Sequence, residues 1–226
     1  MKNKIKAILL LSLSYCSIAT ANETPSLQHL SNDLRGKSFN DNKPWKDLQD
    51  TFLAMNDPDR YAWQLFVSLN WPGNKNNCRP DKKKALGDEG LTTWQMWRSR
   101  EETFLENAVK PKNWKKACAD GAFYTPPEGD TSNIFDEEVR MNKAAYQFIR
   151  SNKLYSLDEQ ERLATQGITD IDFPIGAKEI KAHWVKIEES DKPRYHWIEV
   201  ERDNELTLFG LSALHIISKD MPTWFW

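Results

Sequence analysis

Hydrophobic residues recur with helical spacing through the first part of the chain. Between residues 57 and 70, apolar side chains return every three or four positions, as they do on one face of a helix. Asp57 can cap the first turn, and Pro58 suits the first helical position, where no backbone donor is required. The same spacing predicts helices over residues 44–56, 92–105, 135–156 and 156–167.

The pattern changes after residue 171, from helical spacing to alternation. Residues 178–187 and 194–201 alternate apolar and polar side chains, which is typical of strands with one buried face. Residues 206–218 are almost all apolar, and this favours a central strand covered on both faces. The sequence therefore predicts an α+β fold, with N-terminal amphipathic helices packed on a C-terminal antiparallel β-meander.

Residues 1–21 have the pattern of a secretory signal peptide. Lysines near the N-terminus precede a short apolar run over residues 7–13, and Ala19-Thr20-Ala21 fits a signal-peptidase site. The apolar run is too short to span a membrane, and no later run reaches that length. We therefore expect an exported protein, periplasmic or secreted, with no integral membrane segment after cleavage.

The remainder of the chain predicts one domain behind a flexible arm. Residues 22–43 are polar and weakly patterned, as in a loose N-terminal arm. Residues 44–226 have the length of a single α+β domain. Its helical part covers residues 44–167 and its β part covers residues 171–226.

Charge and cysteine content narrow the class of protein further. The chain has 31 basic and 33 acidic residues, so it lacks the basic excess that is typical of a nucleic-acid-binding protein. Cys16 leaves with the signal peptide, so Cys78 and Cys118 remain and predict one disulfide in an oxidising compartment. The chain has no C-x-x-C-H motif for covalent haem, and the sequence predicts no cofactor.

Three histidines in the predicted strands are the candidate catalytic or metal-binding residues. If the turn between the first two strands centres on residues 190–191, His183 and His196 share a face of the sheet, whereas a slip of one residue separates them. His215 lies in the third strand, and Glu199 lies near the histidines as a candidate carboxylate. The spacing matches no compact metal-ligand motif, and half-buried, hydrogen-bonded histidines beside tryptophans are the alternative interpretation.

Tryptophan is the other conspicuous residue, at 10 of 226 positions. Trp184 and Trp197 each follow a histidine, in predicted neighbouring strands. Facing outward, the pair would form a stacking platform for a sugar ring or another flat ligand; facing inward, it would close the core against the helices. Because alternate side chains point to opposite faces, each histidine points away from its own tryptophan.

The chain ends on three large aromatics, Trp224, Phe225 and Trp226. They follow a polar turn over residues 219–222, which predicts an aromatic segment that folds back on the domain. If these side chains were exposed instead, they would form an apolar patch that requires a partner or further sequence.

Four stretches together resemble an uncharacterised family of secreted bacterial proteins. These are FVSLNWPG, TTWQMWRSREETFL, IDFPIGAKEIKAHW and GLSALHIISKDMPTWFW, with LNWP, KAxW and LHI…WxW as their characteristic elements. Some members of that family are labelled cytochrome c family proteins, but this chain lacks the haem motif, and the resemblance implies no activity. In the family the W-x-W is followed by further sequence, whereas here Trp226 is the last residue, as in a shortened member or a fragment.

These observations lead to one expectation of function and two alternatives. We expect an exported, non-catalytic domain that binds an unknown small molecule, glycan or protein partner. The first alternative is a metal-dependent or His/Glu-dependent hydrolase that uses the histidines and Glu199. The second is a truncated relative of a larger secreted protein.

Overall fold

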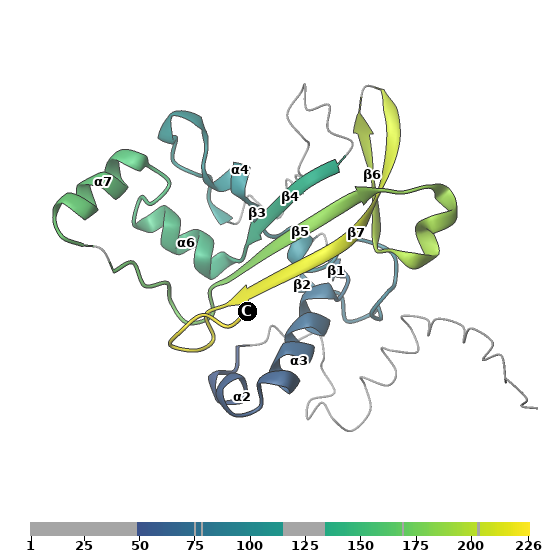
Figure 1. The fold of residues 1–226 in the computed structure, drawn as a ribbon, viewed down its shortest axis with the longest axis horizontal. Coiled ribbons are helices and arrows are strands. Elements are labelled where there is room, and N and C mark those ends of the chain that lie inside the picture. Colours follow the sequence, from purple (N-terminus) through teal and green to yellow (C-terminus); the bar gives the residue numbers. More distant parts are fainter. Residues whose placement is uncertain (1–48, 75, 78, 115–133, 169, 203) are drawn as a thin grey trace, which may run out of the picture.

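The computed structural model describes residues 49–74, 76–77, 79–114, 134–168, 170–202 and 204–226. These residues combine helices with a curled antiparallel sheet of five strands, so the α+β class is confirmed (Figure 1). The predicted signal peptide, the N-terminal arm, Cys78 and Cys118 lie outside the described residues.

The helices of the described part are short. They are α2 (Thr51–Asn56), α3 (Pro58–Asn70), α4 (Arg100–Thr103), α6 (Lys143–Ser151) and α7 (Leu157–Thr165), with 3-10 turns at Trp94–Met96, Glu106–Ala108 and Glu189–Arg194. The helix predicted over residues 57–70 is confirmed in detail, because Pro58 is its first residue and the Asp57 carboxylate accepts from Arg60 N. Among the described residues, no helix combines the length and apolarity needed to cross a bilayer.

The helix predicted over residues 92–105 is wrong. A 3-10 turn leads into the short strand β3 (Arg98–Ser99), and α4 begins only afterwards. Ser99 causes this restart, because its hydroxyl accepts from Glu102 N while the Glu102 carboxylate accepts from Ser99 N. This reciprocal pair is a capping box, which starts a new helix in the middle of the predicted one.

The helix predicted over residues 135–156 is also wrong over residues 135–141. Residues Ile134–Met141 form strand β4, and Asn142 then caps α6 by accepting from Ala145 N. Antiparallel pairing with strand β5 (Lys178–Lys186) decides the strand conformation. Apolar spacing that suits a helix is here overridden by a partner strand some 40 residues away, as tertiary context commonly does.

The strand order is β3-β4-β5-β7-β6, so the predicted meander is wrong. In a meander, β5 would pair with β6 (Trp197–Arg202); instead β7 (Glu205–Ser218) lies between them. The 3-10 turn Glu189–Arg194 separates β5 from β6 along the chain, and a tight hairpin then returns β6 into β7. At 14 residues, β7 is long enough to pair with β6 through its first part and with β5 through the rest.

Within the stretch of β7 that pairs with β5, Phe209–Ser218, one residue has no partner in the ladder. His183 pairs with Ala213 and Trp184 with Leu211, which leaves Ser212 as the extra residue of a β-bulge. A bulge shifts the direction of the side chains around it, and it puts the Ser212 hydroxyl beside His183.

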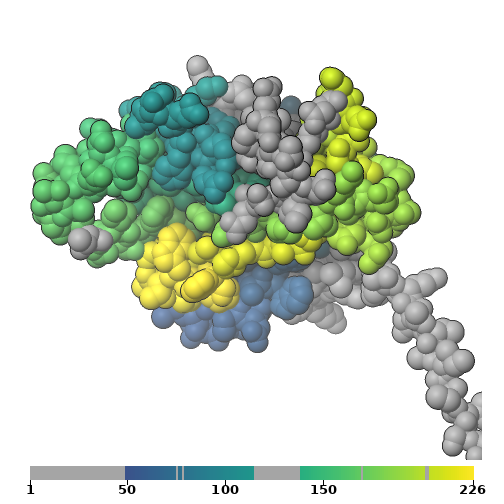
Figure 2. Space-filling model, turned by 45° about the horizontal axis from the view of Figure 1, so that its top comes forward, coloured from purple at the N-terminus to yellow at the C-terminus, as the bar shows by residue number. Residues whose placement is uncertain are grey.

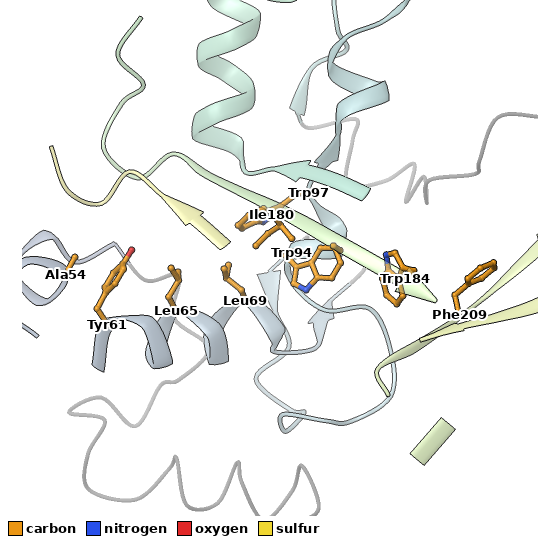
Figure 3. Close-up of a cluster of buried hydrophobic side chains, with 10 residues drawn as sticks. Ala54, Tyr61, Leu65, Leu69, Trp94, Trp97, Ile180, Trp184 and Phe209 are labelled. Atoms are coloured by element: carbon orange, nitrogen blue, oxygen red, sulfur yellow. The ribbon is translucent and has the colours of Figure 1, made fainter. Parts of the chain in front are cut away.

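One face of the sheet, which we call the inner face, carries the main core (Figure 3). Ile180, Ala182 and Trp184 of β5 are completely buried there. The buried cluster also contains Ala54, Tyr61, Leu65, Leu69, Trp94, Trp97 and Phe209. The opposite face of β7 is not covered, because Ser212, Ala213 and His215 are exposed, so the expectation of a strand buried on both faces is wrong.

The segment after β7 folds back, as predicted. Ser218 and Phe225 exchange two backbone hydrogen bonds, of 2.8 and 2.7 Å. The turn between them is anchored in the protein by Asp220, whose carboxylate lies 3.0 Å from Lys178 Nζ and accepts from the Tyr61 hydroxyl at 2.7 Å. This anchor fixes the position of the final aromatic residues relative to the sheet.

Candidate functional site

The candidate site lies on the face of β5 and β7 opposite the core, which we call the outer face. Side chains alternate along β5, so Glu179, Lys181 and His183 share the outer face while their neighbours are buried. His215 of β7 lies directly opposite Lys181 in the ladder. Figure 2 shows the surface that β7 and the C-terminal segment present in yellow.

His183 is held by the bulge residue Ser212. The Ser212 Oγ lies 2.7 Å from His183 Nδ1, and it donates to the His183 carbonyl oxygen at 3.0 Å. A hydroxyl has one proton, so both contacts are satisfied together when Nδ1 carries a hydrogen and donates to Ser212. The imidazole is thereby oriented, and Nε2 is the nitrogen left for another partner.

His215 is held by the last aromatic residue. The rings of His215 and Trp226 stack, with their centroids 6.0 Å apart and their planes inclined by 27°. Trp226 is nevertheless 80% exposed, because its position is set by the backbone pairing of Ser218 with Phe225 rather than by burial. An exposed indole next to a sheet face is a ready surface for a flat or apolar ligand group.

Glu179 is the acidic member of the outer face. Burial raises the pKa of its carboxyl, while the charges of Lys181 and His215 act in the opposite direction and lower it. This balance means that Glu179 and the basic side chains lie close enough to influence one another. Among the side chains that the structure describes, the outer face of β5 and β7 therefore combines a lysine, two histidines and a carboxyl with a weakened preference for ionisation.

His196 lies elsewhere. Its Nε2 is 2.9 Å from Gln95 Oε1 and its ring is 6.0 Å from that of Trp184, both inner-face residues. Burial lowers the pKa of His196 to about 4, so the imidazole is neutral at ordinary pH. The hypothesis that His183 and His196 share a face is wrong, because His196 lies against Trp184 on the inner face whereas His183 lies on the outer face.

Glu199 does not join the two outer-face histidines either. It lies on β6 opposite Leu208, and its carboxylate is 3.5 Å from Lys192 Nζ. Of the four candidate catalytic residues, the structure therefore brings His183 and His215 to one face and places His196 and Glu199 in other environments. Within the described residues, no three His, Cys, Asp or Glu side chains form a group suited to a metal ion.

The two candidate ligand-binding tryptophans have different surroundings. Trp184 is completely buried and donates its indole N–H to Glu138, which is itself paired with Arg140. The prediction that Trp184 belongs to a ligand-binding platform is therefore wrong. Its side chain closes the core, as the alternative interpretation held. Trp197 is half-buried, with the Lys192 ammonium 4.1 Å from its ring centroid, so a cation of the chain itself already occupies one side of the ring.

No family model, curated protein or solved structure matches this chain. The candidate site is therefore inferred from the geometry of the outer face alone.

Sequence reasoning missed three members of this face: Lys181, Ser212 and Trp226. Alternation along residues 178–187 was a signal for Lys181, since it shares a parity with His183. Ser212 reaches His183 through a bulge, and Trp226 stacks on His215. Both contacts join segments that are separate in the sequence, so no local pattern of residues indicates them.

Proposed function

We propose that this is an exported, non-catalytic protein that binds a ligand on the outer face of β5 and β7. The observation that carries the proposal is that His183 and His215 are each held in place, by Ser212 and by Trp226, on a face that is partly exposed to solvent. Side chains ordered before binding lose less conformational entropy when a ligand arrives, which favours affinity. The helices at residues 51–70 support the inner face and leave the outer face for binding.

Export rests on the signal-peptide pattern of residues 1–21 and on the resemblance to secreted bacterial proteins. A binding domain outside the cytoplasm meets small molecules, surface glycans and other exported proteins. We infer that its partner belongs to one of these groups.

A hydrolase is the second candidate, because the His183–Ser212 contact resembles a serine–histidine pair. In such catalysis the imidazole accepts the proton of the serine hydroxyl. Here the hydroxyl donates to the His183 carbonyl oxygen, so the ring nitrogen nearest to Ser212 acts as the donor. We therefore place binding ahead of hydrolysis.

Covalent labelling tests the hydrolase alternative. The mature protein should remain unmodified by a fluorophosphonate probe, which reacts with activated serines. Labelling of Ser212, found by peptide mass spectrometry and absent from a Ser212→Ala variant, would establish the hydrolase in place of the binding protein.

A fragment screen by nuclear magnetic resonance tests the binding proposal. We expect fragments to shift the signals of Lys181, His183 and His215, and to lose this effect in a Trp226→Ala variant. Trp63→Ala is the matched control, because Trp63 of α3 is 57% exposed and remote in sequence from the outer face. A library that shifts only residues on other surfaces would show that the outer face is not the site.

A further inference from the structure

Four residues of the outer face form a strip that follows β7. Ala213 lies directly opposite His183 in the ladder, and His215 lies two residues farther along β7, about 7 Å away. Next to His215 comes the indole of Trp226, whose ring centroid is 6.0 Å from that of the imidazole. We call these four residues the imidazole–indole strip. Ala213, His215 and Trp226 are exposed, so a ligand can reach the strip along β7.

Trp226 gives the strip an apolar surface. Its indole stacks on His215, and the residue is nevertheless 80% exposed, so most of the ring surface that does not touch the imidazole meets water. The backbone hydrogen bonds between Ser218 and Phe225 position the chain next to it. An aromatic ring that is positioned in advance can receive the apolar face of another ring with little loss of conformational entropy.

The two imidazoles supply hydrogen-bonding atoms of both kinds. Because Nδ1 of His183 donates to Ser212, Nε2 of the neutral ring is an acceptor. A neutral His215 ring carries one donor nitrogen and one acceptor nitrogen. A hydroxyl group both donates and accepts, so it can bond to either imidazole. A ligand with several hydroxyl groups can therefore bond to both.

The charged side chains around the strip compensate one another. On β5 the Glu179 carboxyl and the Lys181 ammonium share the outer face two residues apart, and the charge of Lys181 lowers the pKa of Glu179. On β6 the Glu199 carboxylate lies 3.5 Å from Lys192 Nζ. Glu179 would repel an anion on the strip and Lys181 would repel a cation, whereas an uncharged ligand meets neither repulsion.

We propose that the imidazole–indole strip binds an uncharged oligosaccharide; the inference rests on the binding function proposed above. A sugar ring has an apolar C–H face for the indole of Trp226 and hydroxyl groups at its rim for His183 and His215. The side chain of Ala213 is a single methyl group, so it leaves space above the strand between the two imidazoles.

Titration with uncharged trisaccharides tests the inference. The probes are the trimers of glucose, mannose, galactose and N-acetylglucosamine, added to the mature protein and followed by nuclear magnetic resonance. At least one should bind with a dissociation constant of about 1 mM or tighter and shift the signals of Ala213, His215 and Trp226. The trimers of glucosamine and galacturonic acid carry charge on the same kind of ring, and each should bind about threefold or more weakly than the uncharged trimer that binds best.

Variants in matched pairs identify the contacts. Trp226→Ala should weaken binding of the trimer about fivefold or more, whereas Trp63→Ala, which removes another exposed indole, should leave it unchanged. Ala213→Phe should block the strip by filling the space between the imidazoles, and Ala164→Phe, at an exposed alanine of α7, is its control. His183→Ala provides a second test of the same position by removing atoms, and thermal unfolding verifies that each variant is folded.

The outcomes separate this inference from the binding function. If no uncharged trimer binds while fragments still shift the outer face, the inference fails alone; if nothing shifts that face, both proposals fail. A charged trimer that binds as tightly as the best uncharged one would overturn the preference for an uncharged ligand. Trimer binding that survives both Trp226→Ala and Ala213→Phe would place the saccharide elsewhere, and a strip that takes aromatic fragments but no trimer would be a site for another class of ligand; either result overturns the inference.

Discussion

Three histidines in the C-terminal part of the chain show how strongly surroundings determine the chemistry of one residue type. His183 is oriented by a serine and His215 by a tryptophan, both on the outer face. His196 is enclosed by Gln95 and Trp184, and burial holds its pKa near 4. The first two are available to a ligand at neutral pH, whereas the third is a neutral part of the core boundary.

His196 predicts a pH dependence of stability. Its folded pKa of about 4 lies below the usual 6.5, so the unfolded chain takes up the proton more readily. Neutral His196 makes its full contribution to the free energy of unfolding above pH 6.5. This contribution, about 3 kcal/mol in all, is lost as the pH falls towards 4. Urea unfolding should show that wild type loses more stability than a His196→Gln variant between about pH 7 and pH 4.5.

The comparison with the variant is essential, because Glu179 acts with the opposite sign. Burial raises its pKa, so the folded state binds a proton more readily and this contribution to stability is lost as the pH rises. Glu179 is common to both proteins and cancels in the difference. Equal losses in wild type and variant would show that His196 is not held neutral.

Among the elements, the C-terminal segment links the core to the candidate site. Lys178 and Asp220 form an ion pair with side chains 1% and 0% exposed, and Tyr61 of α3 donates to the same carboxylate. This network holds the turn that leads to Trp226. A helix, a strand and the last residues of the chain thus depend on one buried group.

Asp220→Asn should be strongly destabilising. The variant leaves the Lys178 ammonium buried without its counter-charge, at a cost of about 3–5 kcal/mol. Denaturant unfolding measures the loss, and weaker ligand binding should accompany it because Trp226 is no longer anchored. Glu159→Gln, which breaks the surface pair with Arg162, is the control and should change little. If Asp220→Asn and wild type had similar free energies of unfolding, Asp220 would not be the group that anchors the C-terminal turn.

At the scale of the whole molecule, the described residues form a sheet with one covered face and one partly open face. α3 and the residues around Trp94 contribute to the core on the inner face, and Met141 packs with residues of α6 in a second cluster. The outer face of β5 and β7 lies beside this second cluster and carries the candidate site. One face of the sheet is covered by other elements and the other is partly exposed, and this difference limits a ligand on the sheet to the outer face.

Export and the disulfide are predictions for the whole chain. Mature protein recovered from outside the cytoplasm should begin at Asn22, as determined by N-terminal sequencing. A non-reducing peptide map should join Cys78 to Cys118, and the bridge should stabilise the protein by about 4 kcal/mol in the chain-entropy account. Retention in the cytoplasm with the N-terminus intact, or two thiols that react with iodoacetamide, would contradict the corresponding prediction.

What the sequence by itself determined was local. Asp57 and Pro58 start α3, alternation marks β5, and the long apolar run marks β7, because capping and periodicity involve only neighbours in the chain. Only the tertiary structure decided that residues 134–141 form a strand, that β7 lies between β5 and β6, and that Ser212 and Trp226 reach the histidines. These features depend on pairing and packing between distant segments, whose energies outweigh local preference and leave no mark in the spacing of residues.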